Sequence, residues 1–213
     1  MNIFQYIVSS KKALWLLAGA ASGAASVGVM VLGGESWGTI KIFGLDSPNG
    51  NTMFFPPGCI FGLTIAILLF FSSKIRSFWR SIILIGMSGI AHYVAFEIAV
   101  RIADLIKSKF DYSLELIPAG FLAGAIGAAI LGGSFYLLYP IEARWRFAIK
   151  IIGFGALFGT LLFFIFGVGR KTNSFIAYSL LYVPWQAAVA YCLSLFYAPV
   201  QENQTKLPLQ EQD

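Results

Sequence analysis

Six long apolar stretches decide what this chain can fold into. A helix needs roughly 20 predominantly apolar residues to cross the hydrocarbon core of a bilayer, which is about 30 Å thick. Only 12% of the 213 residues are charged, whereas a soluble domain has about a quarter. The sequence therefore predicts an all-α, polytopic integral membrane helical bundle of about six transmembrane helices. The predicted spans are 13–34, 56–73, 80–100, 117–139, 148–168 and 175–197.

The segments between the spans are short, so residues 1–200 are predicted to form a single transmembrane domain. The longest of them, 35–55, contains the turn signal Asp46-Ser47-Pro48-Asn49-Gly50, and we expect this outer loop to cap the bundle. The polar, Gln-rich tail 201–213 is expected to be disordered. No segment offers a soluble domain. This argues against nucleic-acid binding and leaves the lipid bilayer as the expected partner.

The lysines and arginines indicate how the bundle is oriented. With the N-terminus inside, nine of the 15 basic residues fall on cytoplasmic segments and six on the opposite side. Cytoplasmic loops of membrane proteins have the excess of lysine and arginine. We therefore expect both termini to be cytoplasmic, and we expect the protein to reside in the bacterial cytoplasmic membrane.

The chain matches itself weakly at an offset of 99 residues. Ala24–Gly34 aligns with Ala123–Gly133, and five of the eleven positions are identical. A unit of three spans would place its second copy upside down, so the match predicts a 3+3 inverted repeat of the kind common in transporters. The alternative is chance, because apolar sequence rich in glycine and alanine aligns easily with itself.

Small residues recur at four-residue spacing in the first and fourth spans. Gly23 and Gly28 belong to this pattern in the first span, and Gly124 and Gly127 belong to it in the fourth. A stripe of small residues lets another helix backbone approach closely, and packing then drives association in lipid. We predict that these glycines pack helices within the bundle or between protomers of a homo-oligomer.

Two spans place polar side chains at membrane depth, where they are costly and mark functional sites. The third span has Ser88 and His92, and the sixth has Tyr182 and Gln186, close to the helix-breaking Pro184. If the repeat is real, these spans are counterparts and His92 and Gln186 face each other near the midplane. The pattern then predicts a binding site for a small solute. The alternative is a single interhelical hydrogen bond that stabilises the bundle.

Glu97 and Arg101 form a second polar group, near the outer end of the third span. Their four-residue spacing places them on one helical face, with the acid on the N-terminal side, as an ion pair requires. Both side chains can reach the membrane interface from this position. We expect an interfacial ion pair, and the alternative is an outer vestibule that selects a charged solute.

No motif for a metal or a cofactor is present, and none is expected. His92 is the only histidine, which excludes zinc sites of the H-E-x-x-H type and haem held by two histidines. Cys59 and Cys192 fall within apolar spans and lack C-x-x-C spacing.

Enzyme chemistry has little support, and we do not expect an enzyme. Gly86-Met87-Ser88-Gly89 is similar to the G-x-S-G around the nucleophile of rhomboid intramembrane proteases. The resemblance covers four residues and lacks the histidine base that those enzymes place on a different helix.

The sequence favours solute transport or permeation through a site between the third and sixth spans. The alternative is a non-catalytic anchor or scaffold for a partner membrane subunit. An intramembrane enzyme that uses Ser88 and His92 is the third hypothesis.

Overall fold

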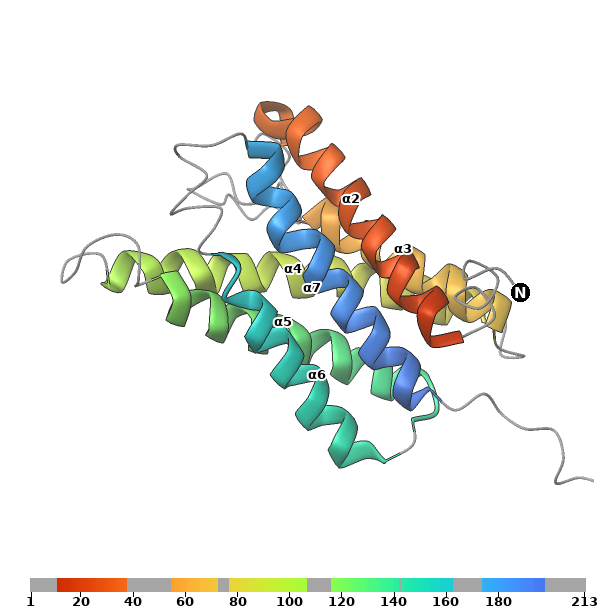
Figure 1. The fold of residues 1–213 in the computed structure, drawn as a ribbon. Coiled ribbons are helices and arrows are strands. Elements are labelled where there is room, and N and C mark those ends of the chain that lie inside the picture. Colours follow the sequence, from red (N-terminus) through yellow and green to blue (C-terminus); the bar gives the residue numbers. More distant parts are fainter. Residues whose placement is uncertain are drawn as a thin grey trace, which may run out of the picture.

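The described residues fold into a bundle of α-helices (Figure 1). The computed structural model describes residues 11–37, 55–72, 77–106, 116–141, 143–162 and 174–197. Within these ranges there is no strand, apart from one isolated bridge between Ile141 and Tyr197. The predicted all-α class is therefore confirmed. The helices are α2 (Lys11–Trp37), α3 (Phe55–Ser72), α4 (Phe78–Ile106), α5 (Leu116–Leu138), α6 (Arg144–Gly159) and α7 (Ser174–Phe196).

Each predicted apolar stretch overlaps one of these helices, because a helix alone pairs the backbone groups of a single segment inside lipid. Four helices, α2, α4, α5 and α7, are long and apolar enough to cross a membrane. The apolar α3 has 18 residues and α6 has 16. The end of the fifth predicted span, 163–168, lies outside the described residues. So do the predicted tail and most of the predicted outer loop.

The helices close into a ring. Each helix packs against its neighbours in the sequence, and α2 also packs against α7, which brings the first and last helices side by side (Figure 1). The beginning of α2 meets the end of α7, as shown by Lys11 Nζ, which lies 4.9 Å from the centre of the Tyr197 ring. Successive helices run in opposite directions, so α2, α4 and α6 all begin at the same end of the bundle.

Glycines allow the two closest helix contacts, α2–α7 and α5–α6. A Cβ placed on Gly23 of α2 would lie only 2.6 Å from the carbonyl oxygen of Tyr182 in α7. In α5, a Cβ on Gly124 would overlap the backbone of Gly155 in α6 and lie 2.8 Å from Cα of Gly159. Small residues are the ones that permit this approach of two backbones in lipid.

The two other glycines with a predicted packing role behave differently from each other. A Cβ on Gly127 would lie 2.9 Å from Cβ of Ala95, so Gly127 packs α5 against α4. A Cβ on Gly28 would have no described atom within 4 Å. Gly28 therefore does not pack against the other described helices, and the alternative that it packs between protomers stays a prediction. Gly28 and Gly127 are aligned in the predicted repeat yet have unlike surroundings, and the repeat stays a prediction.

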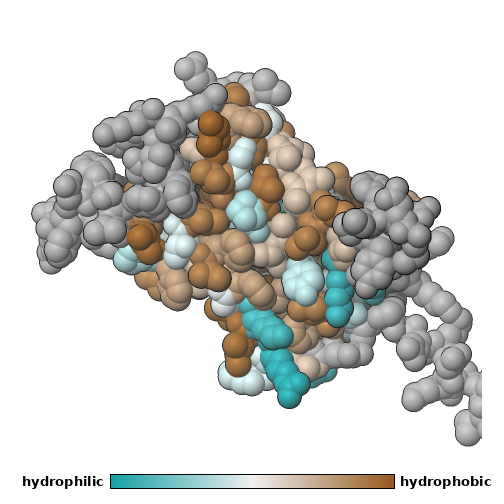
Figure 2. All heavy atoms as spheres, viewed as in Figure 1, coloured by the Kyte–Doolittle hydropathy of each residue, from teal (hydrophilic) through white to brown (hydrophobic). Residues whose placement is uncertain are grey.

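The outside of the bundle is apolar, and its charges are distributed unevenly. Large exposed side chains such as Phe71 and Leu137, 83% and 82% exposed, face outward. Figure 2 shows a mostly hydrophobic surface, with the most hydrophilic residues in the lower half of the view. Of the seven described lysines and arginines, only Arg101 lies at the end of the ring where α4 ends. The other six lie where α2, α4 and α6 begin, which we call the basic end: Lys11, Lys12, Arg80, Arg144, Arg146 and Lys150.

Candidate functional site

Tyr182 and Gln186 are one turn apart on α7, but their side chains contact different helices. Tyr182 stacks beside His92 of α4, with the ring centres 6.4 Å apart and the planes 12° from parallel. Residues in a helix are separated by about 100° of rotation, so position 186 lies about 40° away from position 182. That rotation turns the Gln186 side chain toward α2.

The amide of Gln186 is fully engaged with two serines of α2. Its Oε1 accepts a hydrogen bond of 2.6 Å from the Ser22 hydroxyl, and its Nε2 donates one of 3.0 Å to the Ser26 oxygen. The Ser26 hydroxyl in turn donates to the backbone oxygen of Ser22 at 2.9 Å. All three side chains are buried. The prediction that Gln186 faces His92 is therefore wrong, because the α2–α7 contact uses the amide.

His92 lies in the middle of α4 and has one ring nitrogen without a partner. Its Nδ1 is 3.1 Å from the backbone oxygen of Ser88, which can only accept, so Nδ1 has the proton and donates. In that neutral tautomer Nε2 is an acceptor. Nε2 is buried, and no described residue hydrogen-bonds to it. An unpaired buried acceptor costs free energy, and each one in a native structure needs an explanation.

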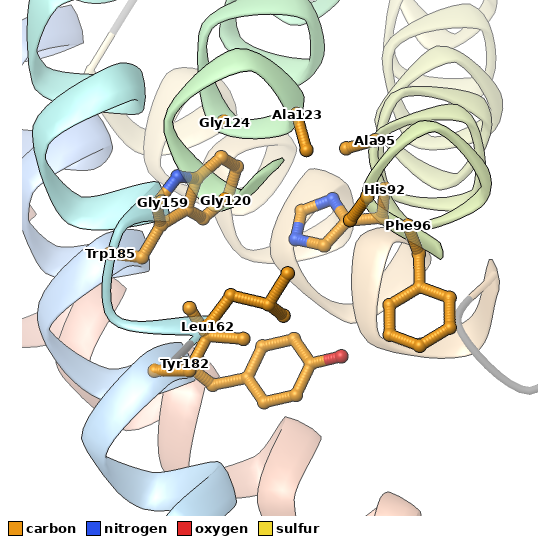
Figure 3. Close-up of a pocket in the computed structure, with 12 residues that line it drawn as sticks. His92, Ala95, Phe96, Gly120, Ala123, Gly124, Gly159, Leu162, Tyr182 and Trp185 are labelled. Atoms are coloured by element: carbon orange, nitrogen blue, oxygen red, sulfur yellow. The ribbon is translucent and has the colours of Figure 1, made fainter. Parts of the chain in front are cut away.

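The imidazole of His92 lines a small cavity whose walls come from α4, α5, α7, the end of α6 and Leu162 after it. Figure 3 shows the ring projecting from α4 between Tyr182 and Trp185 of α7. Trp185 meets the imidazole edge-on, with ring centres 4.7 Å apart and planes at 82°. The cavity has a volume of about 70 Å³. One water needs about 10–15 Å³, so there is room for a few waters or for one small organic molecule.

Glycines form part of the cavity wall. They are Gly120 and Gly124 of α5 and Gly159 of α6, and alanines and leucines form most of the rest. The polar side-chain atoms in the lining residues are those of His92, Tyr182 and Trp185. A Cβ on any of the three glycines would overlap the backbone of the facing helix, so these residues let α5 and α6 touch, and the joined backbones form this side of the cavity.

Ser88 lies on the same helix as His92 but outside the cavity. It is completely buried against α3, where a Cβ on Gly62 would lie 2.8 Å from the Ser88 Cβ. Its hydroxyl has no described hydrogen-bond partner. His92 contacts the backbone oxygen of Ser88 and not this hydroxyl. No described residue therefore makes the hydrogen bond that activates a serine nucleophile, and Ser88 does not line the cavity.

Glu97 and Arg101 form the expected ion pair and do not line the cavity. Arg101 Nε lies 3.6 Å from Glu97 Oε2, with the arginine side chain 76% exposed and the glutamate 15% exposed. Glu97 also has a side-chain hydrogen bond with Tyr93, one turn earlier. Neither charged residue contributes to the cavity wall. This geometry favours the interfacial ion pair over the vestibule.

Sequence reasoning missed two features of the site. Trp185 packs directly on His92, and its signal was its position, since it lies deep inside a span where tryptophan is unusual. The second feature is the pair Gly58 and Gly62 in α3, whose four-residue spacing is visible in the sequence. A Cβ on Gly58 would lie 2.9 Å from the His92 Cβ, so this part of α3 fixes the position of the histidine.

The comparisons with known proteins leave the site to be interpreted from its own chemistry. No protein-family model matches the chain, and no curated protein and no solved structure matches it either. Within the described ranges, no three His, Cys, Asp or Glu side chains gather as metal ligands do. The functional inference rests on the cavity and on the unpaired imidazole nitrogen.

Proposed function

We propose that this is a multi-pass protein of the bacterial cytoplasmic membrane that binds a small neutral solute at His92 and mediates its transport or permeation. One observation supports this most directly: Nε2 of His92 is buried, has no described hydrogen-bond partner, and belongs to a residue that lines a cavity. A polar group at membrane depth without a structural partner is a functional candidate. The site in this proposal consists of His92, Tyr182 and Trp185, and leaves out Gln186 and Ser88.

The chemistry of the cavity defines the class of solute. The unprotonated Nε2 accepts a hydrogen bond, so the solute needs a donor such as an amide or hydroxyl group. The walls are otherwise apolar, and none of the described residues that line them has a side chain of formal charge. A buried ion would therefore be uncompensated, which is costly. The volume restricts the solute to a few non-hydrogen atoms.

The charge distribution supports the orientation in this proposal. The described lysines and arginines other than Arg101 lie at the basic end, and the positive-inside rule places that end in the cytoplasm. The chain enters α2 and leaves α7 at the basic end, which supports the proposal that both termini are cytoplasmic. The cavity extends from the middle of α4 toward Ala99, that is, toward the opposite side of the membrane.

Because His92 is the only histidine, NMR can report on the site directly. Protein made with ¹⁵N-histidine and purified without a histidine tag gives the signals of one imidazole. In lipid nanodiscs we expect acetamide, urea or glycerol to shift the Nε2 resonance. Acetone, which is close to acetamide in size but has no donor, serves as the matched control and is expected to leave the resonance unchanged.

A flux measurement tests the transport part of the proposal. Proteoliposomes are exposed to an osmotic step of urea or glycerol, and the change in volume is followed by light scattering. We expect faster equilibration than in empty liposomes, and we expect His92→Phe to return the rate to that of the empty vesicles. If no donor solute shifts the Nε2 resonance and the fluxes equal those of empty vesicles, the polar group is structural and the proposal is wrong.

A scaffold or anchor subunit is the second candidate, and a different observation favours it. Gly28, Gly86 and Gly153 have no described atom within 4 Å of an added Cβ, so they are open on the outside of the bundle. Small residues on an outer face suit close packing with another membrane helix. Native mass spectrometry of protein released gently from its own membrane tests this. A second polypeptide in fixed ratio supports the scaffold, and protein with lipid alone argues against it.

A further inference from the structure

A groove between α5 and α6 opens toward the basic end of the bundle. It has a volume of about 400 Å³, and its walls are mostly apolar. Gly133 and Tyr136 of α5 form one wall, and Arg144, Ala148 and Ile152 of α6 form part of the other. This groove is separate from the His92 cavity, and the inference below does not depend on solute binding or transport at His92, although it uses the proposed orientation of the basic end.

The packing of α5 on α6 explains why the groove is there. At one end of the pair, Gly124 and Gly155 bring the two backbones into contact. Toward the basic end, side chains fill the space between the helices, and a Cβ on Gly132 would lie 2.9 Å from the Ile151 side chain. The helices therefore diverge toward the beginning of α6 (Figure 1). The divergence exposes the outer side of Gly133, where an added Cβ would meet no described atom within 4 Å.

The groove has a positive charge on its wall. The Arg144 guanidinium lies over the Tyr136 ring, 5.3 Å from its centre, and its side chain is exposed. Arg146 and Lys150 follow within the first two turns of α6. Among the described side chains at the basic end there is no carboxylate to neutralise them. The next residue, Trp145, is 77% exposed, as expected for an aromatic ring at the membrane interface.

We infer that this groove is a binding site for an anionic phospholipid. An acyl chain lies against the apolar wall formed by Gly133, Ala148 and Ile152, and the phosphate accepts hydrogen bonds from the Arg144 guanidinium. Basic pockets between transmembrane helices on the cytoplasmic side select acidic headgroups in this way. A zwitterionic lipid brings a cationic group toward the same arginines and lysines, so charge complementarity favours phosphatidylglycerol over phosphatidylcholine.

Native mass spectrometry of delipidated protein tests the inference with two lipids that share the same acyl chains. Dioleoyl phosphatidylglycerol and dioleoyl phosphatidylcholine are titrated separately, and bound lipid is counted. We expect a preference for phosphatidylglycerol, and Arg144→Gln is expected to weaken its binding about tenfold by removing a charge-assisted hydrogen bond. Arg146→Gln is the matched control, because Arg146 is also exposed on the same turn but does not line the groove.

A second pair of variants tests the groove itself. Gly133→Leu fills the space and is expected to reduce the binding of both lipids. Gly153→Leu adds the same side chain to α6, away from the groove, where an added Cβ also meets no described atom, and it is expected to change nothing. Equal losses for Arg144→Gln and Arg146→Gln would overturn the inference in favour of diffuse surface charge. Unchanged phosphatidylglycerol binding in Gly133→Leu would also overturn it.

A measurement on the wild-type protein removes the dependence on variants that fail to fold. Phosphatidylglycerol with a photoactivatable diazirine in its acyl chain is incorporated into nanodiscs and cross-linked. We expect the labelled peptides to come from residues 129–152, which contain both walls of the groove. Labelling spread evenly over the lipid-facing helices indicates annular lipid only and contradicts a site.

Discussion

The two faces of α7 bury polar groups in opposite ways. On the face toward α2, the Gln186 amide has two hydrogen bonds, with Ser22 and Ser26. On the face toward α4, Tyr182 and Trp185 surround an imidazole whose Nε2 has no described partner. A buried polar group that is fully paired stabilises the helix contact. A buried polar group that is left unpaired beside a cavity does not provide that stability. The face of α7 toward α4 is therefore the candidate for binding.

Glycine contributes to both faces in different ways. Gly19 and Gly23 bring the backbone of α2 into close contact with that of α7. Gly120 and Gly159 form a backbone contact between α5 and α6, and both residues line the cavity beside His92. The same residue type therefore packs a helix directly against one face of α7 and lines a cavity on the other. Changing these residues is the most direct way to test the comparison.

The largest effect is expected from Gly23→Leu. A Cβ at this position would lie 2.6 Å from backbone atoms of Tyr182 and Val183, so α2 must move away from α7 and the Gln186 hydrogen bonds are lost. Overpacking of this kind costs about 3 kcal/mol or more when backbone must shift. We expect little folded, monodisperse protein by size-exclusion chromatography in detergent. Gly28→Leu is the matched control in the same helix and is expected to fold normally.

A smaller loss is expected from Gln186→Leu, which keeps the volume of the side chain and removes both of its hydrogen bonds. Interhelical hydrogen bonds in membranes are worth about 0.6–2 kcal/mol each, so we expect the loss of two to lower the free energy of unfolding by about 1–4 kcal/mol. The His92 resonance is expected to respond to solutes as in the wild type. A variant of unchanged stability that no longer responds to solutes would reverse the roles assigned to the two faces.

The sequence predicted the six helices well because the bilayer sets their length. It did not predict how each helix is rotated. In lipid both the inner and the outer faces of a helix are apolar, so periodicity does not reveal which face points inward. Gly23 and Gly28 looked equivalent for this reason, and only the first contacts another described helix. The prediction that Gln186 faces His92 was wrong for the same reason. Gln186 is rotated by about 40° from Tyr182, so its side chain contacts α2 while Tyr182 lines the cavity.

Position along a helix was also an incomplete guide. Trp15 lies near the beginning of the first span, where tryptophan favours the membrane interface. In the structure it is completely buried, with its ring centre 6.2 Å from that of Tyr197. The contact exists because α2, the first described helix in the sequence, packs against α7, the last one. Local sequence does not contain that information.

His92→Phe is expected to separate stability from function. Phenylalanine keeps a ring against Trp185 and removes the unpaired Nε2, and the Ser88 carbonyl that Nδ1 contacted remains within the helix. Removing an unsatisfied buried acceptor is neutral or stabilising, by up to about 1 kcal/mol. We expect an unchanged or slightly raised melting temperature together with the loss of solute flux. A melting temperature that falls as far as that of Gln186→Leu would mean that both polar groups are structural.

The smallest effect is expected from Glu97→Gln, at a position of α4 that does not line the cavity. The partner, Arg101, is 76% exposed and the pair distance is 3.6 Å, so solvent screens the attraction. Exposed ion pairs contribute about 0.2–1 kcal/mol, and glutamine can keep the hydrogen bond to Tyr93. We expect a small fall in melting temperature that disappears in high salt, with the solute fluxes unchanged. A selective loss of flux at unchanged stability would instead assign the pair to a solute entrance. The candidate binding region beside α7 would then include this outer part of α4.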